Sequence, residues 1–217
     1  MKILNWLKQE WIYLLLLVLP FILIGYYWEQ IPDRFPVHYN LEGKPDGWAD
    51  SPLDLWLVLL LNVPSYFLFY FLPVLDKNKK NTSFYRQHLP LIRFLVHLLL
   101  CFIPVIMLFG AINNQIDVWV LKVGLIVFIM LLSNFISSAP QNYFIGFRTP
   151  WALLNERVWR KTQVFSARLW FGLSALMLIA IIGEVDNEIL FLLYVCLLVL
   201  LPFLYSFLVY KRVQSEV

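Results

Sequence analysis

The stretch Leu91–Ile112 reads LIRFLVHLLLCFIPVIMLFGAI, and only Arg93 and His97 in it can become positively charged. As a helix it would be about 33 Å long, at about 1.5 Å per residue. That length matches the hydrocarbon core of a bilayer, which is about 30 Å thick. The stretch therefore predicts a transmembrane helix.

Similar apolar runs recur along the chain, which is 61% hydrophobic and 14% charged and has a mean hydropathy of +0.72. Soluble domains carry about 25% charged residues, so much of this apolar surface must face lipid. Five further runs are long enough to cross a bilayer: residues 11–28, 53–75, 118–138, 167–183 and 189–210. We predict an all-α membrane protein, a bundle of six transmembrane helices with no sizeable soluble domain.

Lysine and arginine are distributed unevenly between the connecting segments, and this asymmetry predicts orientation. Only Arg34 and Lys44 lie on one side, and Lys122 lies within a run. Positive residues favour the cytoplasm, so both chain ends are predicted to be cytoplasmic. The opposite face is acidic and should attract a cationic partner. The cytoplasmic set comprises Lys2, Lys8, Lys77, Lys79, Lys80, Arg86, Arg93, Arg148, Arg157, Arg160, Lys161, Arg168, Lys211 and Arg212.

Loop lengths suggest two parts. Residues 1–90 would form a pair of transmembrane helices joined by a structured outer loop (residues 29–52). Residues 91–217 would form a four-helix region that contains a long cytoplasmic inner loop (residues 139–166).

The outer loop is rich in residues that shape turns. Pro45, Asp46 and Gly47 are turn signals, and residues 35–39 are expected to be extended because they precede or include proline. If the turn folds back, His38, Asn40, Asp46 and Trp48 would converge, and we predict that this loop contributes to ligand binding. The alternatives are that these residues only stabilise the loop, or that His38 forms a metal site with Asp46 or Asp50, although one histidine without cysteine is a poor zinc ligand set. We predict no metal and no cofactor.

The inner loop contains a helix start, since Thr149 can cap a helix whose first residue is Pro150. From there Trp151 and Leu154 share one face with Val158, and basic residues lie largely off it. We predict a short interfacial helix over residues 149–161 on the cytoplasmic membrane surface, with Trp151 and Leu154 toward the lipid. Its basic residues could hold anionic lipid or dock a cytosolic protein.

Polar residues within the runs raise the question of chemistry. The candidates are Asn62, His97, Lys122, Ser133, Asn134 and Ser137. Such residues are functional hypotheses in a membrane, but they also serve as hydrogen-bonding contacts between helices, the interpretation that we favour. No oxyanion-hole, nucleotide-binding or paired-carboxylate motif accompanies them, so we predict that the protein is not an enzyme.

Two motifs carry a resemblance to a known family. The outer loop contains His38-Tyr39-Asn40, then Gly43 and Pro45-Asp46-Gly47-Trp48, and it resembles the small N-terminal domain of unknown function found in the SdpI family. The inner loop resembles that family's signature segment (residues 142–162). Its matching residues are Asn142, Ile145, Gly146, Arg148, Thr149, Pro150, Trp151, Leu153, Val158, Trp159 and Thr162. Gln163 and Ser166 depart from the pattern, where histidine and glycine are usual.

The resemblance implies a bacterial inner-membrane protein that protects against a secreted peptide toxin and can hold a transcriptional repressor at the membrane. The implied partners are membrane lipid, an extracellular peptide and a cytosolic regulatory protein, without direct nucleic-acid binding. A small transporter or channel is the alternative, and an intramembrane enzyme is a weaker one. Outer-loop candidates for ligand binding are His38, Asn40, Glu42, Gly43, Asp46 and Trp48. Inner-loop candidates for partner docking are Asn142, Gly146, Arg148, Thr149, Trp151, Arg157, Trp159, Arg160 and Lys161.

Overall fold

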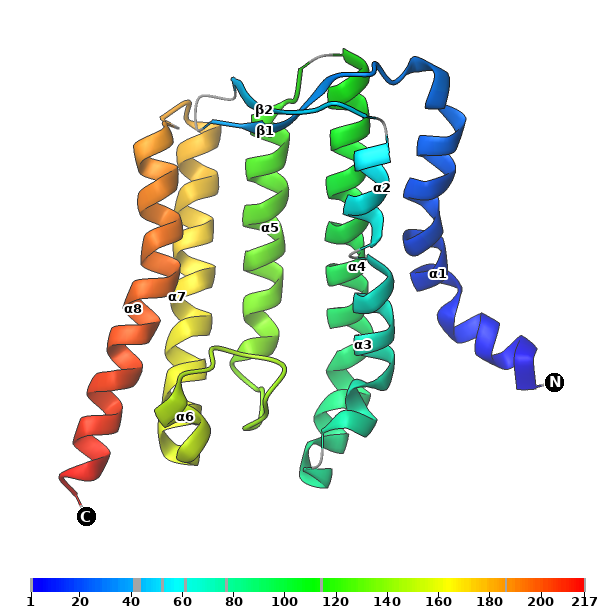
Figure 1. The fold of residues 1–217 in the computed structure, drawn as a ribbon. Coiled ribbons are helices and arrows are strands. Elements are labelled where there is room, and N and C mark those ends of the chain that lie inside the picture. The colour runs from blue at the N-terminus through cyan, green and yellow to red at the C-terminus, as the bar shows by residue number, and fades with distance from the viewer. Residues whose placement is uncertain are drawn as a thin grey trace. The chain divides into compact units, whose positions relative to one another are not determined.

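The computed structural model describes residues 2–40, 44–51, 53–60, 62–76, 78–113, 115–185 and 187–216, and it is mostly helical (Figure 1). Two short strands lie between the first two helices, and two 3₁₀ turns complete the elements. The helices are α1 (Lys2–Tyr26), α2 (Leu53–Leu60), α3 (Asn62–Leu75), α4 (Thr82–Asn113), α5 (Val118–Ile136), α6 (Pro150–Leu154), α7 (Glu156–Ile182) and α8 (Glu188–Gln214). The others are β1 (Phe35–Tyr39), β2 (Pro45–Ala49), η1 (Trp28–Gln30) and η2 (Lys79–Asn81).

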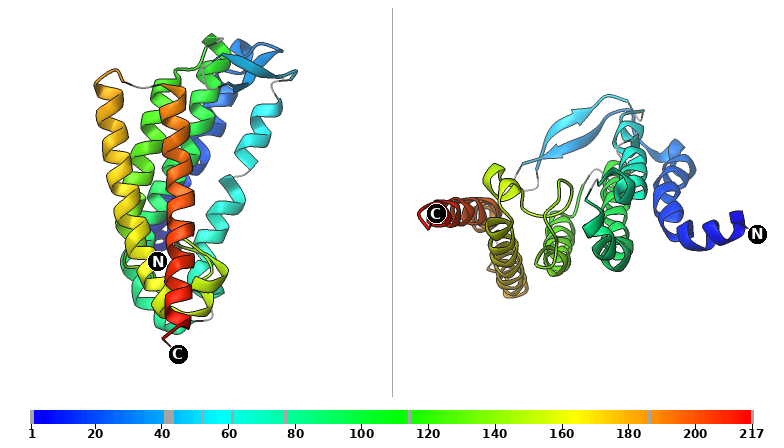
Figure 2. Two further views of the ribbon diagram at one scale, coloured as in Figure 1. Left: turned by 90° about the vertical axis from the view of Figure 1, so that its left-hand side faces the viewer. Right: turned by 90° about the horizontal axis from the view of Figure 1, so that it is seen from below.

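Five of the described helices, α1, α4, α5, α7 and α8, are long and apolar enough to cross a membrane. This finding agrees with the predicted class, a helical multi-pass membrane protein. The predicted span over residues 53–75 instead consists of two consecutive shorter helices, α2 and α3 (Figures 1 and 2). The count of six spanning helices therefore stays a prediction.

Contacts group the chain into two compact units: residues 1–71 with 91–124, and residues 72–90 with 125–217. The predicted division at residue 90 is not tested by this grouping and stays a prediction. In the first unit, the buried Phe35 of β1 lies in a core formed with side chains of α1, α2 and α4. The other buried members of that core are Ile24, Ile31, Ala49, Leu55, Leu59, Leu108 and Ala111.

In the second unit, α7 and α8 lie side by side and run in opposite directions (Figure 1). Trp170 of α7 donates a hydrogen bond from Nε1 to the carbonyl oxygen of Leu198, and the hydroxyls of Ser174 and Tyr194 lie 2.9 Å apart. Near α6, Ala152, Val158, Trp159 and Val209 form a buried cluster. This cluster fixes the inner loop against both helices.

Two local predictions were wrong. Residues 45–47 belong to β2 rather than to a turn, so the outer loop adds a β-hairpin to the expected all-α fold. The helix predicted over residues 149–161 ends at Leu154, because Asn155 is extended. Its side chain accepts a hydrogen bond from the backbone N–H of Val158 and so caps α7, a new helix. Leu154 and Val158 were expected on the same face of that helix. In the structure Leu154 is exposed, whereas Val158 is fully buried.

Candidate functional site

The outer hairpin (residues 35–49) brings together several of the predicted ligand-binding residues. His38 pairs with Gly47 in the antiparallel register, and its Nδ1 lies 2.5 Å from Oδ1 of Asp46. Asn40 accepts a hydrogen bond at Oδ1 from the backbone N–H of Lys44, 2.9 Å away, which closes the loop end. A Cβ at Gly47 would lie 2.7 Å from that of His38, so the register requires glycine there.

Two side chains on the hairpin keep exposed surface. Trp48 is 43% exposed, and the Arg34 guanidinium lies 5.3 Å from its ring centroid. The side chain of Asp46 is 43% exposed beside His38. In the described ranges, no third histidine, cysteine, aspartate or glutamate joins this pair to form a metal-ligand cluster. The candidates Glu42 and Gly43 lie outside the described residues.

The signature segment is held by side chains that satisfy its backbone. Asn142, which is 3% exposed, accepts hydrogen bonds from the backbone N–H groups of Phe144 and Ile145 and donates to the carbonyl oxygens of Pro140 and Ile145. Gln163 both accepts from the N–H and donates to the carbonyl oxygen of Phe147, at 2.8 and 2.9 Å. These residues therefore fix the shape of the segment.

The Ser206 hydroxyl on α8 contacts three polar side chains of the signature segment. Its Oγ lies 2.8 Å from Oγ1 of Thr149, 2.8 Å from Nε1 of Trp151 and 2.9 Å from Oγ1 of Thr162. Thr149, Thr162 and Ser206 are all at most 2% exposed. Trp151 therefore packs toward α8 rather than pointing to lipid as predicted. Trp159 is also buried, and its Nε1 donates to the carbonyl oxygen of Ala139.

Gly146, the single glycine in the sequence of this segment, should not tolerate a side chain. Its φ is +116°, and a Cβ there would lie 2.6 Å from Oε1 of Gln163. We expect Gly146→Ala to destabilise the protein by about 1–3 kcal/mol, because a side chain at such a φ is strained and would displace Gln163. Denaturant unfolding of the purified protein measures this loss. Gly172→Ala is the matched control, since a Cβ at Gly172 in α7 meets nothing within 4 Å. Equal stability of the two variants would contradict the assignment.

The remaining inner-loop candidates are exposed. Arg148 donates to the carbonyl oxygen of Tyr143, and Arg157 forms an ion pair with Glu216 at 2.5 Å. Arg160 and Lys161 lie on the exposed first turns of α7. The nine predicted docking residues thus separate into two groups. The buried frame consists of the buried Asn142, Thr149 and Trp159 and the half-buried Gly146 and Trp151, and the exposed basic group consists of Arg148, Arg157, Arg160 and Lys161.

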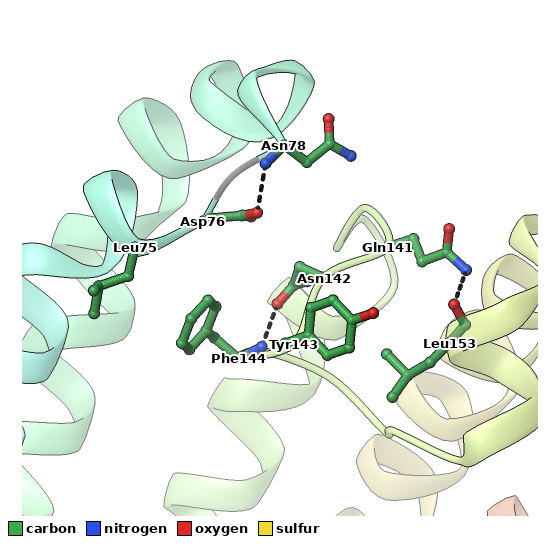
Figure 3. Close-up of a pocket in the computed structure, with 8 residues that line it drawn as sticks. All are labelled: Leu75, Asp76, Asn78, Gln141, Asn142, Tyr143, Phe144 and Leu153. Carbon is green, nitrogen blue, oxygen red and sulfur yellow. Dashed lines mark hydrogen bonds between the residues drawn. The ribbon is translucent and has the colours of Figure 1, made fainter.

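A pocket of about 470 Å³ opens beside the frame (Figure 3). Its walls come from the segment after α3, from residues 141–144 and from Leu153 of α6. Burial opposes ionisation of Asp76, but hydrogen bonds from Tyr85, Asn81 and the backbone N–H of Asn78 outweigh it, and they lower the pKa of that carboxyl. Asn81 also donates to the carbonyl oxygen of Gln141 and so connects the two walls.

An ion pair that sequence reasoning missed lies in the first unit. Glu10 of α1 and Arg93 of α4 form two hydrogen bonds of 2.6 and 3.0 Å, and both residues are less than 9% exposed. Tyr66 donates a third hydrogen bond to Glu10, and the Arg93 guanidinium lies 4.1 Å from the Tyr13 ring centroid. One feature of the sequence could have indicated this ion pair: Glu10 is an acidic residue next to an apolar run, and the other charged residues nearby, Lys2 and Lys8, are basic.

The polar residues predicted within the apolar runs have different kinds of partner. Asn62 of α3 donates to the carbonyl oxygen of Leu100 in α4, which confirms one contact between helices. Ser133 and Asn134 instead donate to carbonyl oxygens of their own helix, α5, and Ser137, which follows α5, donates to the carbonyl oxygen of Asn134. His97 is 1% exposed among the rings of Tyr13, Tyr66 and Phe69.

Comparisons with known proteins agree with these two loops. Residues 138–206 match the SdpI/YfhL protein family, and residues 15–63 match a domain of unknown function (DUF1648). The resemblance to the SdpI family is confirmed. The chain is also 22% identical over 213 residues to "Immunity protein SdpI" of Bacillus subtilis (strain 168), covering 97% of this chain and 100% of that protein. No solved structure matches the chain.

Proposed function

We propose that this chain is a membrane immunity protein that engages an extracellular peptide toxin through its outer hairpin. The observation that carries the proposal is the similarity to an immunity protein along nearly the whole chain. The hairpin supports it, because β2 presents an exposed carboxylate, that of Asp46, and an exposed aromatic ring, that of Trp48, two residues apart in sequence. The proposal places the hairpin outside the cell and both chain ends in the cytoplasm, as the distribution of lysine and arginine predicts.

The hairpin chemistry suits a cationic or amphipathic peptide. Asp46 supplies charge, and Trp48 supplies a flat apolar surface that also accepts cations. His38 and Asn40 have a different part in the proposal, since their hydrogen bonds hold the two strands in register. Glu42, which lies outside the described residues, would supply a second carboxylate.

Complementation tests the immunity function. A Bacillus subtilis strain that lacks its own SdpI would carry this chain and be exposed to the peptide toxin against which SdpI protects. We expect growth to be restored. Sensitivity at a normal membrane level of the protein would contradict the proposal. We propose further that the chain recruits a cytosolic regulatory protein. In the same cells, movement of a fluorescent copy of the cognate repressor to the membrane would test this recruitment.

Asp46→Asn is expected to reduce protection roughly tenfold or more at unchanged membrane abundance, because the substitution removes the charge and keeps the side-chain shape. The survival curve against toxin concentration measures the effect, and it should resemble the wild-type curve more closely as salt rises and screens the charge. Glu29→Gln is the matched control, since Glu29 is an exposed acidic residue in η1, outside the hairpin. Equal protection by both variants would show that the hairpin carboxylate has no part in engaging the peptide.

Recruitment of a cytosolic protein would use the exposed surface that the buried frame supports. Tyr143 lines the pocket of Figure 3 and is exposed, and Arg148 donates a hydrogen bond to its carbonyl oxygen. Leu154 of α6 is also exposed. Asn142, Gly146, Thr149, Trp151 and Trp159 would then act indirectly, by holding this surface in shape. Arg157, Arg160 and Lys161 line a separate groove with different chemistry.

A further inference from the structure

A basic groove of about 420 Å³ lies along α7 and contacts α8. Four of its lining side chains are cationic: Arg157, Arg160, Lys161 and Arg168. Its floor includes Phe165 and Tyr205, whose rings stack with centroids 4.0 Å apart and an interplanar angle of 11°. The groove thus combines positive charge with an aromatic surface that bridges two spanning helices.

Among the described residues, ion pairs compensate few of the charges in this groove. Arg157 pairs with Glu216, but no ion pair of Arg160, Lys161 or Arg168 is found in the described part of the chain. No acidic residue is among the residues that line the groove. A ligand for it should therefore be an anion.

The position of Arg168 along α7 indicates which anion. Beyond it, residues 169–182 carry no charge and extend the helix by about 21 Å, at about 1.5 Å per residue. A bilayer core is about 30 Å thick, so Arg168 falls within or at the edge of the hydrocarbon when the far end of α7 reaches the opposite boundary. A cation at that depth needs a counter-charge that is itself held in the membrane.

We propose that the groove binds an anionic phospholipid. The phosphate would lie among Arg160, Lys161 and Arg168, and an acyl chain would lie against Phe165 and Tyr205. Soluble phosphate would satisfy the charges but leave the aromatic floor unused. Basic pockets between transmembrane helices are known to bind anionic headgroups, and arginine forms paired hydrogen bonds with phosphate. This inference requires only that α7 spans the membrane, so it does not depend on toxin immunity.

The test is lipid selectivity of the full-length protein. Native mass spectrometry of the purified chain would compare retention of phosphatidylglycerol with that of phosphatidylcholine of the same acyl chains. We expect the wild-type protein to prefer phosphatidylglycerol. A triple variant that combines Arg160→Gln, Lys161→Gln and Arg168→Gln should bind that lipid more weakly, on the order of 100-fold. The control is a second triple variant that removes the same amount of charge elsewhere, at the exposed positions Lys79→Gln, Lys80→Gln and Arg86→Gln. This control should retain the preference.

The outcomes separate the sources of the anion. Displacement of the lipid by millimolar glycerol phosphate would overturn the proposal in favour of a soluble phosphate site. Equal loss in the control variant, or no preference in wild type, would reduce the effect to general electrostatics and overturn it. If the groove variant kept its lipid but lost repressor recruitment, the groove would be a protein-docking surface instead. An unchanged melting temperature in phosphatidylcholine nanodiscs shows that the groove variant is folded.

Discussion

Glu10→Gln is expected to destabilise the protein by about 3–5 kcal/mol, the largest single effect that the structure predicts. The substitution leaves the Arg93 guanidinium buried without its carboxylate, and an uncompensated buried charge is strongly destabilising. The rings of Tyr13 and Tyr66 lie 4.1 and 5.6 Å from that guanidinium, but cation–π attraction contributes only about 2 kcal/mol. Unfolding by sodium dodecyl sulfate in mixed micelles measures the loss.

A double substitution distinguishes the charge effect from a packing effect. Glu10→Met with Arg93→Met removes both charges and keeps apolar volume, and such replacements of buried pairs are often neutral or stabilising. The double variant should therefore be more stable than Glu10→Gln alone. Arg86→Gln, at an exposed position of the same helix α4, is the control and should change stability by less than about 0.5 kcal/mol. Wild-type stability of Glu10→Gln would mean that water reaches this pair.

This ion pair also shows where sequence reasoning stops. Arg93 was counted only as a topology signal, and Glu10 lies one residue before an apolar run, so neither residue indicated a partner. The two are far apart in the chain, and their contact depends on how α1 packs against α4. Apolar pattern and bilayer thickness predict that helices exist, but they carry little information about which buried polar groups meet.

In the two loops, proline and helix-capping residues predicted local structure better than the apolar pattern predicted contacts between helices. The prolines around residues 35–39 indicated an extended segment, and β1 confirms it. Thr149 caps α6 as predicted, with a hydrogen bond from the backbone N–H of Ala152. The end of that helix was missed because Asn155 was taken as an interior residue. Asparagine followed by Glu156 is itself a helix-start signal, and in the structure Asn155 caps α7.

The hydrogen bonds that hold the signature segment could not be predicted from the family motif. Gln163 lies where the family pattern has histidine, so it was treated only as a departure from the pattern. In the structure its amide bonds both backbone polar groups of one residue, Phe147, because an amide can donate and accept at the same time. Ser206 stands out even less, as one hydroxyl within a long apolar helix. Its importance arises only when residues distant in sequence converge on it.

Ser206→Ala is expected to destabilise the protein by about 2–4 kcal/mol, because it removes the shared partner of Thr149, Trp151 and Thr162. A buried polar group left without a partner costs about 1–3 kcal/mol, and the two threonines can recover part of that loss through nearby backbone groups.

Ser174→Ala is the matched control: Ser174 is an equally buried serine that contacts one hydroxyl, that of Tyr194, so its loss should be about 1 kcal/mol. Unfolding in mixed micelles compares the two variants. Hydrogen exchange should also rise at residues 147–154 in Ser206→Ala and stay unchanged there in Ser174→Ala, since of these two serines only Ser206 contacts the signature segment. Equal stability and equal exchange in both variants would show that the segment is held by its apolar cluster alone.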